Sequence, residues 1–127
     1  MVKDKAYYDS LTEQIIHCAF TVSNILGCGF LEKVYENALV RELVGSGLSV
    51  ETQKPIKVIY RGQIVGNYVT DVIVEDIIIL ELKALKNIEN IHLAQCQNYL
   101  KATGIKLGLI INFGEEKVKV RRIVNGL

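Results

Sequence analysis

The sequence is poor in the residues that build zinc sites and disulfide frameworks. Its 127 residues include only 3 Cys and 2 His. Cys18, Cys28 and Cys96 are odd in number and form no Cys-x-x-Cys pair, which argues against both kinds of site. We therefore expect three thiols buried as small hydrophobic side chains in a cytoplasmic, reducing environment. His17 and His92 have no partner at ligand spacing, so we expect surface or capping roles for them.

Long hydrophobic segments are also missing. All apolar runs fall far short of the roughly 20 residues that a membrane-spanning helix needs. The first ten residues alternate charges where a secretory signal would have an apolar core. Half of the residues are hydrophobic and 23% are charged, which is typical of a globular protein. We therefore expect one domain over residues 1–127, with no membrane contact.

A strong net charge is missing as well, but the charges are unevenly distributed. The formal net charge is +1. Residues 1–53 contain 4 Lys/Arg and 7 Asp/Glu, a net −3, whereas residues 54–127 contain 11 and 7, a net +4. The basic half includes Arg121 and Arg122, which are candidates for contact with a phosphate backbone. A solvated surface is the alternative explanation.

The periodicity of apolar residues predicts an α/β fold in the order α-α-β-β-β-β-α-β-β. Apolar residues at helical spacing predict helices over 10–26, 30–44 and 90–103, each followed by a glycine. Strands are expected over residues 48–60 with an interruption or bend at Pro55, over 63–65 and 68–74 with a bulge or kink at Gly66-Asn67 between them, and over 77–85, 105–113 and 118–123. This order predicts a mixed sheet with helices packed on it.

Acids at the two ends of an apolar strand pair suggest a metal site. Charged residues are rarely buried unless they are paired or bind a metal. A three-residue turn over 75–77 places Asp71 directly opposite Glu81, whereas a two-residue turn at 75–76 places them on opposite faces of the sheet. In the first register, two adjacent carboxylates suit Mg²⁺ or Mn²⁺. Lys83 shares a face with Glu81, where it would orient a water molecule or hold a phosphate; a structural ion pair is the alternative.

These residues resemble a known nuclease signature. Asp71 followed by Glu81-Leu82-Lys83 is similar to the Asp…(Asp/Glu)-x-Lys pattern of the PD-(D/E)xK nuclease superfamily, although Val69-Thr70 replaces its proline. A longer resemblance is to the GxxExxY protein family, from about residue 11 to 122. It rests on residues 29–39 (GFLEKVYENAL), 66–71 (GNYVTD), 81–84 (ELKA), 92–104 (HLAQCQNYLKATG) and 109–114 (LIINFG).

The resemblance implies a restriction-endonuclease-like fold, nuclease activity and further site residues. An acid on the first core helix often joins the metal site in this superfamily, and both Glu32 and Glu36 are candidates. Gln95 and Tyr99 resemble the Gln-x-x-x-Tyr motif of exonuclease branches, in which the pair contacts DNA or supports the metal ligands. A solvent-exposed role for the two glutamates and plain packing for Tyr99 are the alternatives.

The sequence therefore favours a Mg²⁺- or Mn²⁺-dependent nuclease acting on DNA, with RNA as a second substrate class. Its expected catalytic residues are Asp71, Glu81, Lys83, Glu32 and Gln95. A homodimer is expected, because superfamily members that cut duplexes often use one subunit for each strand. Two alternatives are a catalytically silent module that binds nucleic acid or a protein partner, and a small-molecule hydrolase using the same metal.

Overall fold

A computed structural model describes residues 3–127 and follows the expected order of elements. Segments 63–65 and 68–74 are one continuous strand, because Gly66 and Asn67 pair with the preceding strand. The helices are α1 Lys5–Leu26, α2 Glu32–Gly45 and α3 Asn90–Thr103. The strands are β1 Val50–Tyr60, β2 Gln63–Val74, β3 Ile78–Lys83, β4 Leu107–Asn112 and β5 Lys119–Val124.

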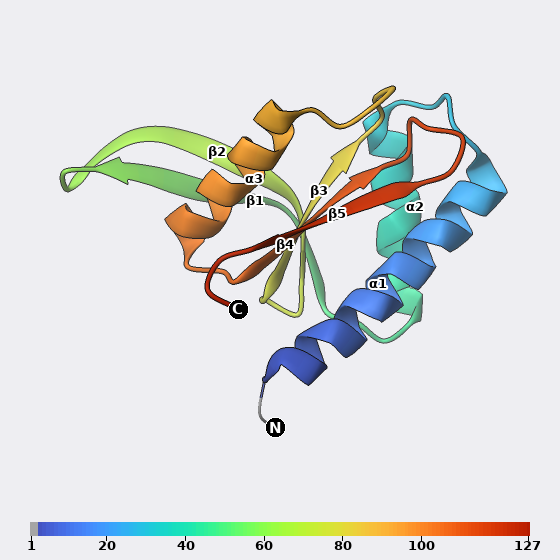
Figure 1. Cartoon of the computed structure of the whole chain (residues 1–127), viewed down its shortest axis with the longest axis horizontal. Helices are drawn as coiled ribbons and strands as arrows, with labels where there is room; N and C mark the ends of the chain where they lie inside the picture. Colours follow the sequence, from blue (N-terminus) through green and yellow to red (C-terminus); the bar gives the residue numbers. More distant parts are fainter. Residues whose placement is uncertain (1–2) are drawn as a thin grey trace.

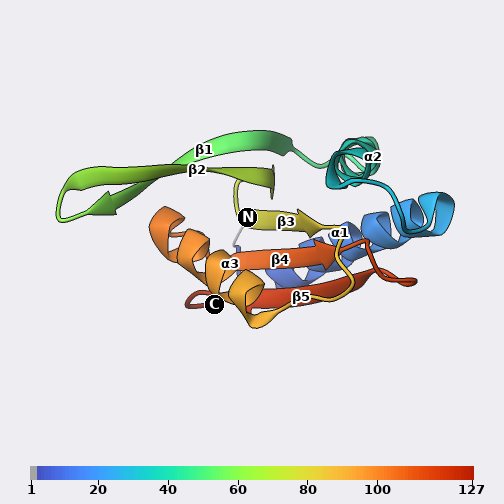
Figure 2. The ribbon, with the colours of Figure 1, turned by 90° about the horizontal axis from the view of Figure 1, so that it is seen from above.

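The five strands form one mixed sheet in the order β1-β2-β3-β4-β5 (Figures 1 and 2). Only β3 and β4 are parallel, and α3 makes the crossover between them. Helices α1 and α2 pack on one face of the sheet, whereas α3 packs on the other. The expected mixed sheet flanked by helices is thus confirmed.

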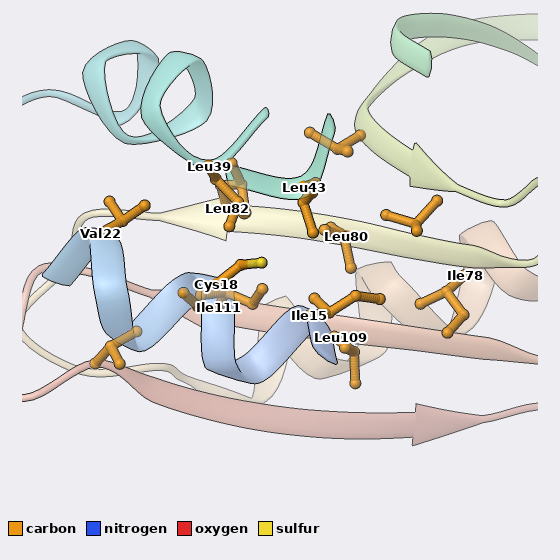
Figure 3. Packing of buried hydrophobic residues seen from close by; sticks show 14 of the residues in the cluster. Ile15, Cys18, Val22, Leu39, Leu43, Ile78, Leu80, Leu82, Leu109 and Ile111 are labelled. Carbon is orange, nitrogen blue, oxygen red and sulfur yellow. The ribbon is translucent and has the colours of Figure 1, made fainter. Parts of the chain in front are cut away.

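The main core lies between the sheet and the helices α1 and α2 (Figure 3). Alternate residues of the central strands point to this side, and the residues between them point to α3. Because both faces of β3 and β4 are covered, their sequences are almost continuously apolar. No helix within residues 3–127 is long and apolar enough to cross a membrane. The side chains labelled in Figure 3 include Ile15, Cys18 and Val22 of α1, Leu39 and Leu43 of α2, and Leu80, Leu82, Leu109 and Ile111 of the strands.

Helix α1 begins five residues earlier than its apolar periodicity indicates. Asp4 is the N-cap, and its carboxylate accepts a hydrogen bond of 3.0 Å from the backbone N–H of Tyr7. This cap satisfies one of the free donors at the helix end and therefore extends the helix through a polar segment. The added turn also carries Asp9, which pairs with a β5 side chain.

A buried tyrosine fixes the connection between α1 and α2. The Tyr35 hydroxyl donates to the carbonyl of Gly27 at 2.6 Å and accepts from the N–H of Phe30 at 3.2 Å. Its ring stacks on Phe113, with centroids 4.7 Å apart. Cys28 in this connection is exposed, so the expectation of three buried thiols is wrong for it, while Cys18 and Cys96 are buried.

Strand β1 is distorted at Gln53. The hairpin β1–β2 curves away from the rest of the sheet (Figure 1). Gln53 has a φ of +52°, a left-handed conformation that is uncommon for a residue other than glycine. Its neighbours Thr52 and Lys54 pair with β2, but Gln53 itself does not. Pro55 is tolerated just beyond this distortion because β1 is an edge strand of the sheet.

The loop after β3 is tied to the end of β4. The amide of the buried Asn112 accepts from the Leu85 N–H at 2.9 Å and donates to the Leu85 carbonyl at 3.0 Å. Gly114 packs directly against the backbone of Ala84 and Leu85, in space that a Cβ atom would occupy. These contacts fix the chain immediately after Lys83.

We expect Gly114→Ala to lower the free energy of unfolding by roughly 1–3 kcal/mol, because the new methyl group would force the backbone of the loop to shift. Gly45→Ala is the matched control, since a Cβ there meets nothing within 4 Å and alanine favours the end of α2. Denaturant unfolding measures both variants. Equal stability of the two variants would contradict this packing.

Candidate active site at the fork between β2 and β3

The two strand acids lie where β2 and β3 separate. Val72 pairs with Leu80 and Val74 pairs with Ile78, so the hairpin has the three-residue turn and Asp71 faces Glu81 across the strands. Regular pairing of β2 with β3 covers only Val72–Val74. The part of β2 before Val72 belongs to the hairpin that curves away from β3. Of the two registers that the sequence left open, the structure has the one with the three-residue turn, and the regular pairing of β2 with β3 stops next to both acids.

Glu81 is buried with only 7% of its surface exposed. Its Oε1 accepts a 2.7 Å hydrogen bond from the Tyr68 hydroxyl and a longer one, 3.4 Å, from Thr70. Burial raises the pKa of Glu81 to about 7, and the negative charge of Asp71 adds to this rise. The Tyr68 hydrogen bond and the positive charge of Lys83 oppose it. Glu81 therefore exchanges its proton near neutral pH while metal-free.

Asp71 is half-buried and caps the neighbouring strand. Its Oδ2 accepts a hydrogen bond of 2.9 Å from the backbone N–H of Leu82. Burial raises the pKa of Asp71, and the Leu82 hydrogen bond partly offsets this effect. The charge of Glu36 raises the pKa further, whereas Lys83 and Lys33 lower it. Charges from β2, β3 and α2 thus act on one another at the fork.

The structure brings Glu36, and not Glu32, to this group. Glu36 is 5% exposed, and its two oxygens accept hydrogen bonds from Gln53 Nε2 at 2.8 Å and Lys33 Nζ at 2.7 Å. Glu32 lies exposed in the first turn of α2 and forms no hydrogen bond or ion pair within residues 3–127. An acid at this end of a helix interacts favourably with the helix dipole, which explains Glu32 without a metal.

Helix α3 contributes Tyr99 to the other side of the site. The Tyr99 ring stacks on Tyr68, with centroids 3.4 Å apart and planes inclined by 15°. Burial raises the pKa of Tyr99, and the charge of Glu81 contributes to the rise. Gln95 lies one turn before Tyr99 on α3 and is exposed. The stack therefore positions Tyr68, whose hydroxyl donates to Glu81. Gln95 lies one turn from Tyr99 on the same helix.

The two arginines of β5 lie on opposite faces of the sheet. Arg121 pairs with Ile110, which pairs in turn with Glu81, so Arg121 lies on the face of Glu81 two strands away. Arg122 points to the other face and forms a 2.9 Å ion pair with Asp9 of α1. The structure therefore does not bring Arg122 to the acids, because consecutive strand residues point to opposite sides.

The donors at the fork suit a hard divalent cation. Among residues 3–127, no group of three or more acidic, His or Cys side chains converges to hold a metal ion. Mg²⁺, however, usually keeps several waters and binds one or two carboxylates. Asp71 Oδ1 and Glu81 Oε2 accept no hydrogen bond from residues 3–127, and a cation would relieve the charge that burial disfavours on both acids. The chemistry of the fork therefore fits such an ion.

Sequence reasoning missed the residues that orient the acids. Tyr68 and Thr70 contact Glu81, Gln53 contacts Glu36, and Asn112 holds the loop after Lys83. Tyr68 and Thr70 belong to the segment 66–71 that carries the family resemblance, so a signal existed for them. Gln53 carried no such signal, because its contact depends on the distortion of β1.

The arrangement defines a nuclease-type fold of the restriction-endonuclease-like class, and similar solved structures share it. The crystal structure of SSO0001 has a TM-score of 0.56 to this one, and the two sequences are 20% identical. The match covers 96% of this chain and 61% of SSO0001. An alkaline exonuclease from Laribacter hongkongensis is 15% identical, with a TM-score of 0.55 over 98% of this chain and 72% of that one. This chain thus spans less than two thirds of the length of SSO0001. At these identities the likeness concerns the fold alone.

The chain belongs to the PD-(D/E)XK nuclease superfamily, whose family model matches residues 9–123. The match includes the helix acids, the fork and α3. No curated protein sequence is similar enough to count as a relative.

We expect Glu81 to make the metal-free protein less stable as the pH rises. Its carboxyl pKa is about 7 in the folded state and near 4.5 when unfolded, so the folded state holds a proton that the unfolded chain releases between these values. The free energy of unfolding therefore falls through this window, relative to Glu81→Gln, by roughly 2–3 kcal/mol. Denaturant unfolding of both proteins at pH 4.5 and pH 8, with a chelator, measures the difference.

Glu13→Gln is the matched control for this prediction, because Glu13 is exposed on α1. The stability difference between this variant and the wild type should not change with pH. If the difference in free energy of unfolding between the wild type and Glu81→Gln is the same at low and high pH, Glu81 is not the group that titrates.

Proposed function

We propose that this protein is a divalent-metal-dependent nuclease that hydrolyses DNA phosphodiester bonds, acting as one domain of the GxxExxY type. The observation that carries the proposal is the facing pair of Asp71 and Glu81 at the fork, with Lys83 two residues beyond Glu81. Membership of the nuclease superfamily supports hydrolysis of nucleic acid. DNA is proposed as the principal substrate and RNA as the second one to test.

In this proposal each residue of the fork has a separate task. Asp71 and Glu81 would hold Mg²⁺ or Mn²⁺, which supplies an acidic bound water and neutralises charge on the phosphate. Tyr68 and Thr70 hydrogen-bond to the Glu81 carboxylate, and Gln53 and Lys33 hydrogen-bond to that of Glu36, which orients both acids before substrate binds.

Lys83 is proposed to act on the phosphate or on the attacking water. Within residues 3–127 it forms no salt bridge, so its ammonium group is not committed to a partner. Hydrolysis joins the water oxygen to phosphorus and breaks the bond to the leaving oxygen of the nucleic acid, which takes up a proton. Hydrogen bonds donated by Lys83 would orient the water or hold the phosphate during this exchange.

The proposal includes a homodimer. Several large apolar side chains are exposed on and beside α1 and α2, among them Ile25, Leu31 and Val44. A second copy of the chain would cover such a surface, and two sites would address the two strands of a duplex. Light scattering at tens of micromolar tests this part, and a monomer at that concentration would argue against it.

We expect Glu81→Gln to lower the rate of single-turnover cleavage by about a hundredfold or more, since it removes a charged ligand from the metal. Lys83→Gln should reduce cleavage similarly, whereas Glu116→Gln, at an exposed position, should not. Plasmid and oligonucleotide cleavage with Mg²⁺ or Mn²⁺ measures the rates. Addition of either metal at pH 8 should raise the unfolding temperature of the wild type but not of Glu81→Gln.

Two outcomes would contradict the proposal. Equal cleavage by the wild type and Glu81→Gln would place the activity at another site or in a contaminant. A wild type that binds nucleic acid but cuts neither DNA nor RNA with either metal would favour the silent binding module.

A further inference from the structure

The part of the β1–β2 hairpin beyond Gln53 forms an arm, defined here as residues 54–70. The arm projects away from the sheet and extends past α3 in both views of the ribbon (Figures 1 and 2). Its base leans on α3 through the stack of Tyr68 on Tyr99. One residue after Thr70, the same strand carries Asp71. Whatever the arm binds is therefore placed next to the fork.

The arm carries charge of only one sign. It contains Lys54, Lys57 and Arg61 and no Asp or Glu, although the chain as a whole has 15 basic and 14 acidic residues. Lys54 and Lys57 line a pocket between the arm and the end of α3, with Asp76 as its one acidic lining residue. Lys54 also forms a solvent-exposed 3.5 Å ion pair with Glu51, just before the arm. Arg61 lies at the tip, so the cations extend from the base of the arm to its end. This distribution suits a polyanion.

The tip of the arm exposes apolar side chains in place of the usual polar surface of a hairpin. Ile59, Ile64 and Val65 are 65%, 55% and 61% exposed. Val58 and Tyr60 are exposed as well, and the pairing of Ile59 with Ile64 and of Tyr60 with Gln63 distributes these side chains over both faces of the ribbon. Exposed apolar side chains gathered at the end of a hairpin indicate a binding surface.

The turn at the tip contains a residue that the turn itself does not favour. Arg61 and Gly62 have φ values of +49° and +77°, which makes this a two-residue turn of the I′ class. Asparagine is preferred at the first position because it tolerates the left-handed conformation, whereas arginine does so poorly. The guanidinium lies 5.6 Å from the centre of the Tyr60 ring. Such an outlier is best explained by a role of the side chain outside the fold.

We propose that the arm is a nucleic-acid-binding ribbon that enters the major groove of a duplex and presents the neighbouring phosphate to the fork. A two-stranded ribbon fits the major groove, which is about 12 Å wide. The three cations contact phosphates on its two sides, and the apolar tip meets the base edges. This inference rests on the proposed nuclease function for its substrate, but binding by the arm requires no cleavage.

A second copy of the arm is a poorer occupant for this surface. Two arms paired edge to edge would bring six cations together, of which only the two Lys54 side chains have an acid beside them (Glu51 Oε2 at 3.5 Å), and like-charge repulsion disfavours this pairing. Duplex nucleic acid instead offers the opposite charge along the whole length of the ribbon.

Arg61→Asn separates a binding role from a structural one, because the two roles predict opposite effects. The unfolding temperature should rise slightly, since asparagine suits the turn. Affinity for a short DNA duplex without metal should fall several-fold, and the slope of its logarithm against that of the salt concentration should become shallower by about 1. Arg41→Gln, which removes an exposed cation from α2, should leave affinity and slope nearly unchanged.

Shortening the arm provides a stronger test. Lys57 and Asn67 are directly paired, so an Asn-Gly turn can replace residues 58–66 and close the hairpin at this pair. The shortened protein should keep its circular dichroism spectrum and its unfolding temperature, because the removed side chains are largely exposed. Its affinity for the duplex should fall by roughly tenfold or more.

These measurements test binding by the arm separately from cleavage at the fork. Unchanged duplex affinity in both Arg61→Asn and the shortened protein would overturn the proposal, even if the wild type cleaves DNA. Conversion of a wild-type dimer to a monomer on shortening, with duplex affinity unchanged, would assign the arm to self-association. Arm-dependent binding by a wild type that cuts nothing would support the arm and reject the nuclease.

Discussion

The distortion of β1 at Gln53 is the constraint on which the site depends. If the β1–β2 hairpin were flat, all of β3 would pair with β2, and Asp71 and Glu81 would lie within a regular ladder of hydrogen bonds. Because the hairpin curves away from β3, the Asp71 carboxylate reaches the Leu82 N–H and Tyr68 reaches Glu81. The same left-handed residue extends its amide to Glu36. One local distortion thus opens the fork, links α2 to it and directs the arm outward.

The electrostatics of the fork show a compromise between folding and function. Burial of Glu81 and Asp71 disfavours their charged forms, and the neighbouring cation Lys83 relieves this only in part. Replacement of buried charged groups by apolar residues of the same volume is often neutral or stabilising. The neutral donors Tyr68 and Thr70 orient Glu81 without neutralising it, which leaves its charge available for a cation from solution.

Much of the fold followed from the sequence, whereas the site followed only in outline. Apolar periodicity located the helices and the central strands, because burial determines both. The acids of the fork were identified from charges in an apolar pair, but their register depended on a turn over 75–77 that propensity alone did not decide. The choice between Glu32 and Glu36 required the position of Gln53. Arg121 and Arg122 were grouped by sequence proximity, although alternation in a strand separates adjacent side chains.

The short turn between β2 and β3 also bears on the order in which the protein folds. Asp71 and Glu81 are only ten residues apart, and hairpins of this size form within about 1–10 μs. The parallel contact of Ile78 with Leu107 closes a much longer loop through α3, and its formation is correspondingly slower. In the bare hairpin the two acids would be surrounded by water, which screens their repulsion. The electrostatic cost of the site therefore comes from the burial that α3 and α2 add, and not from the hairpin that brings the acids together.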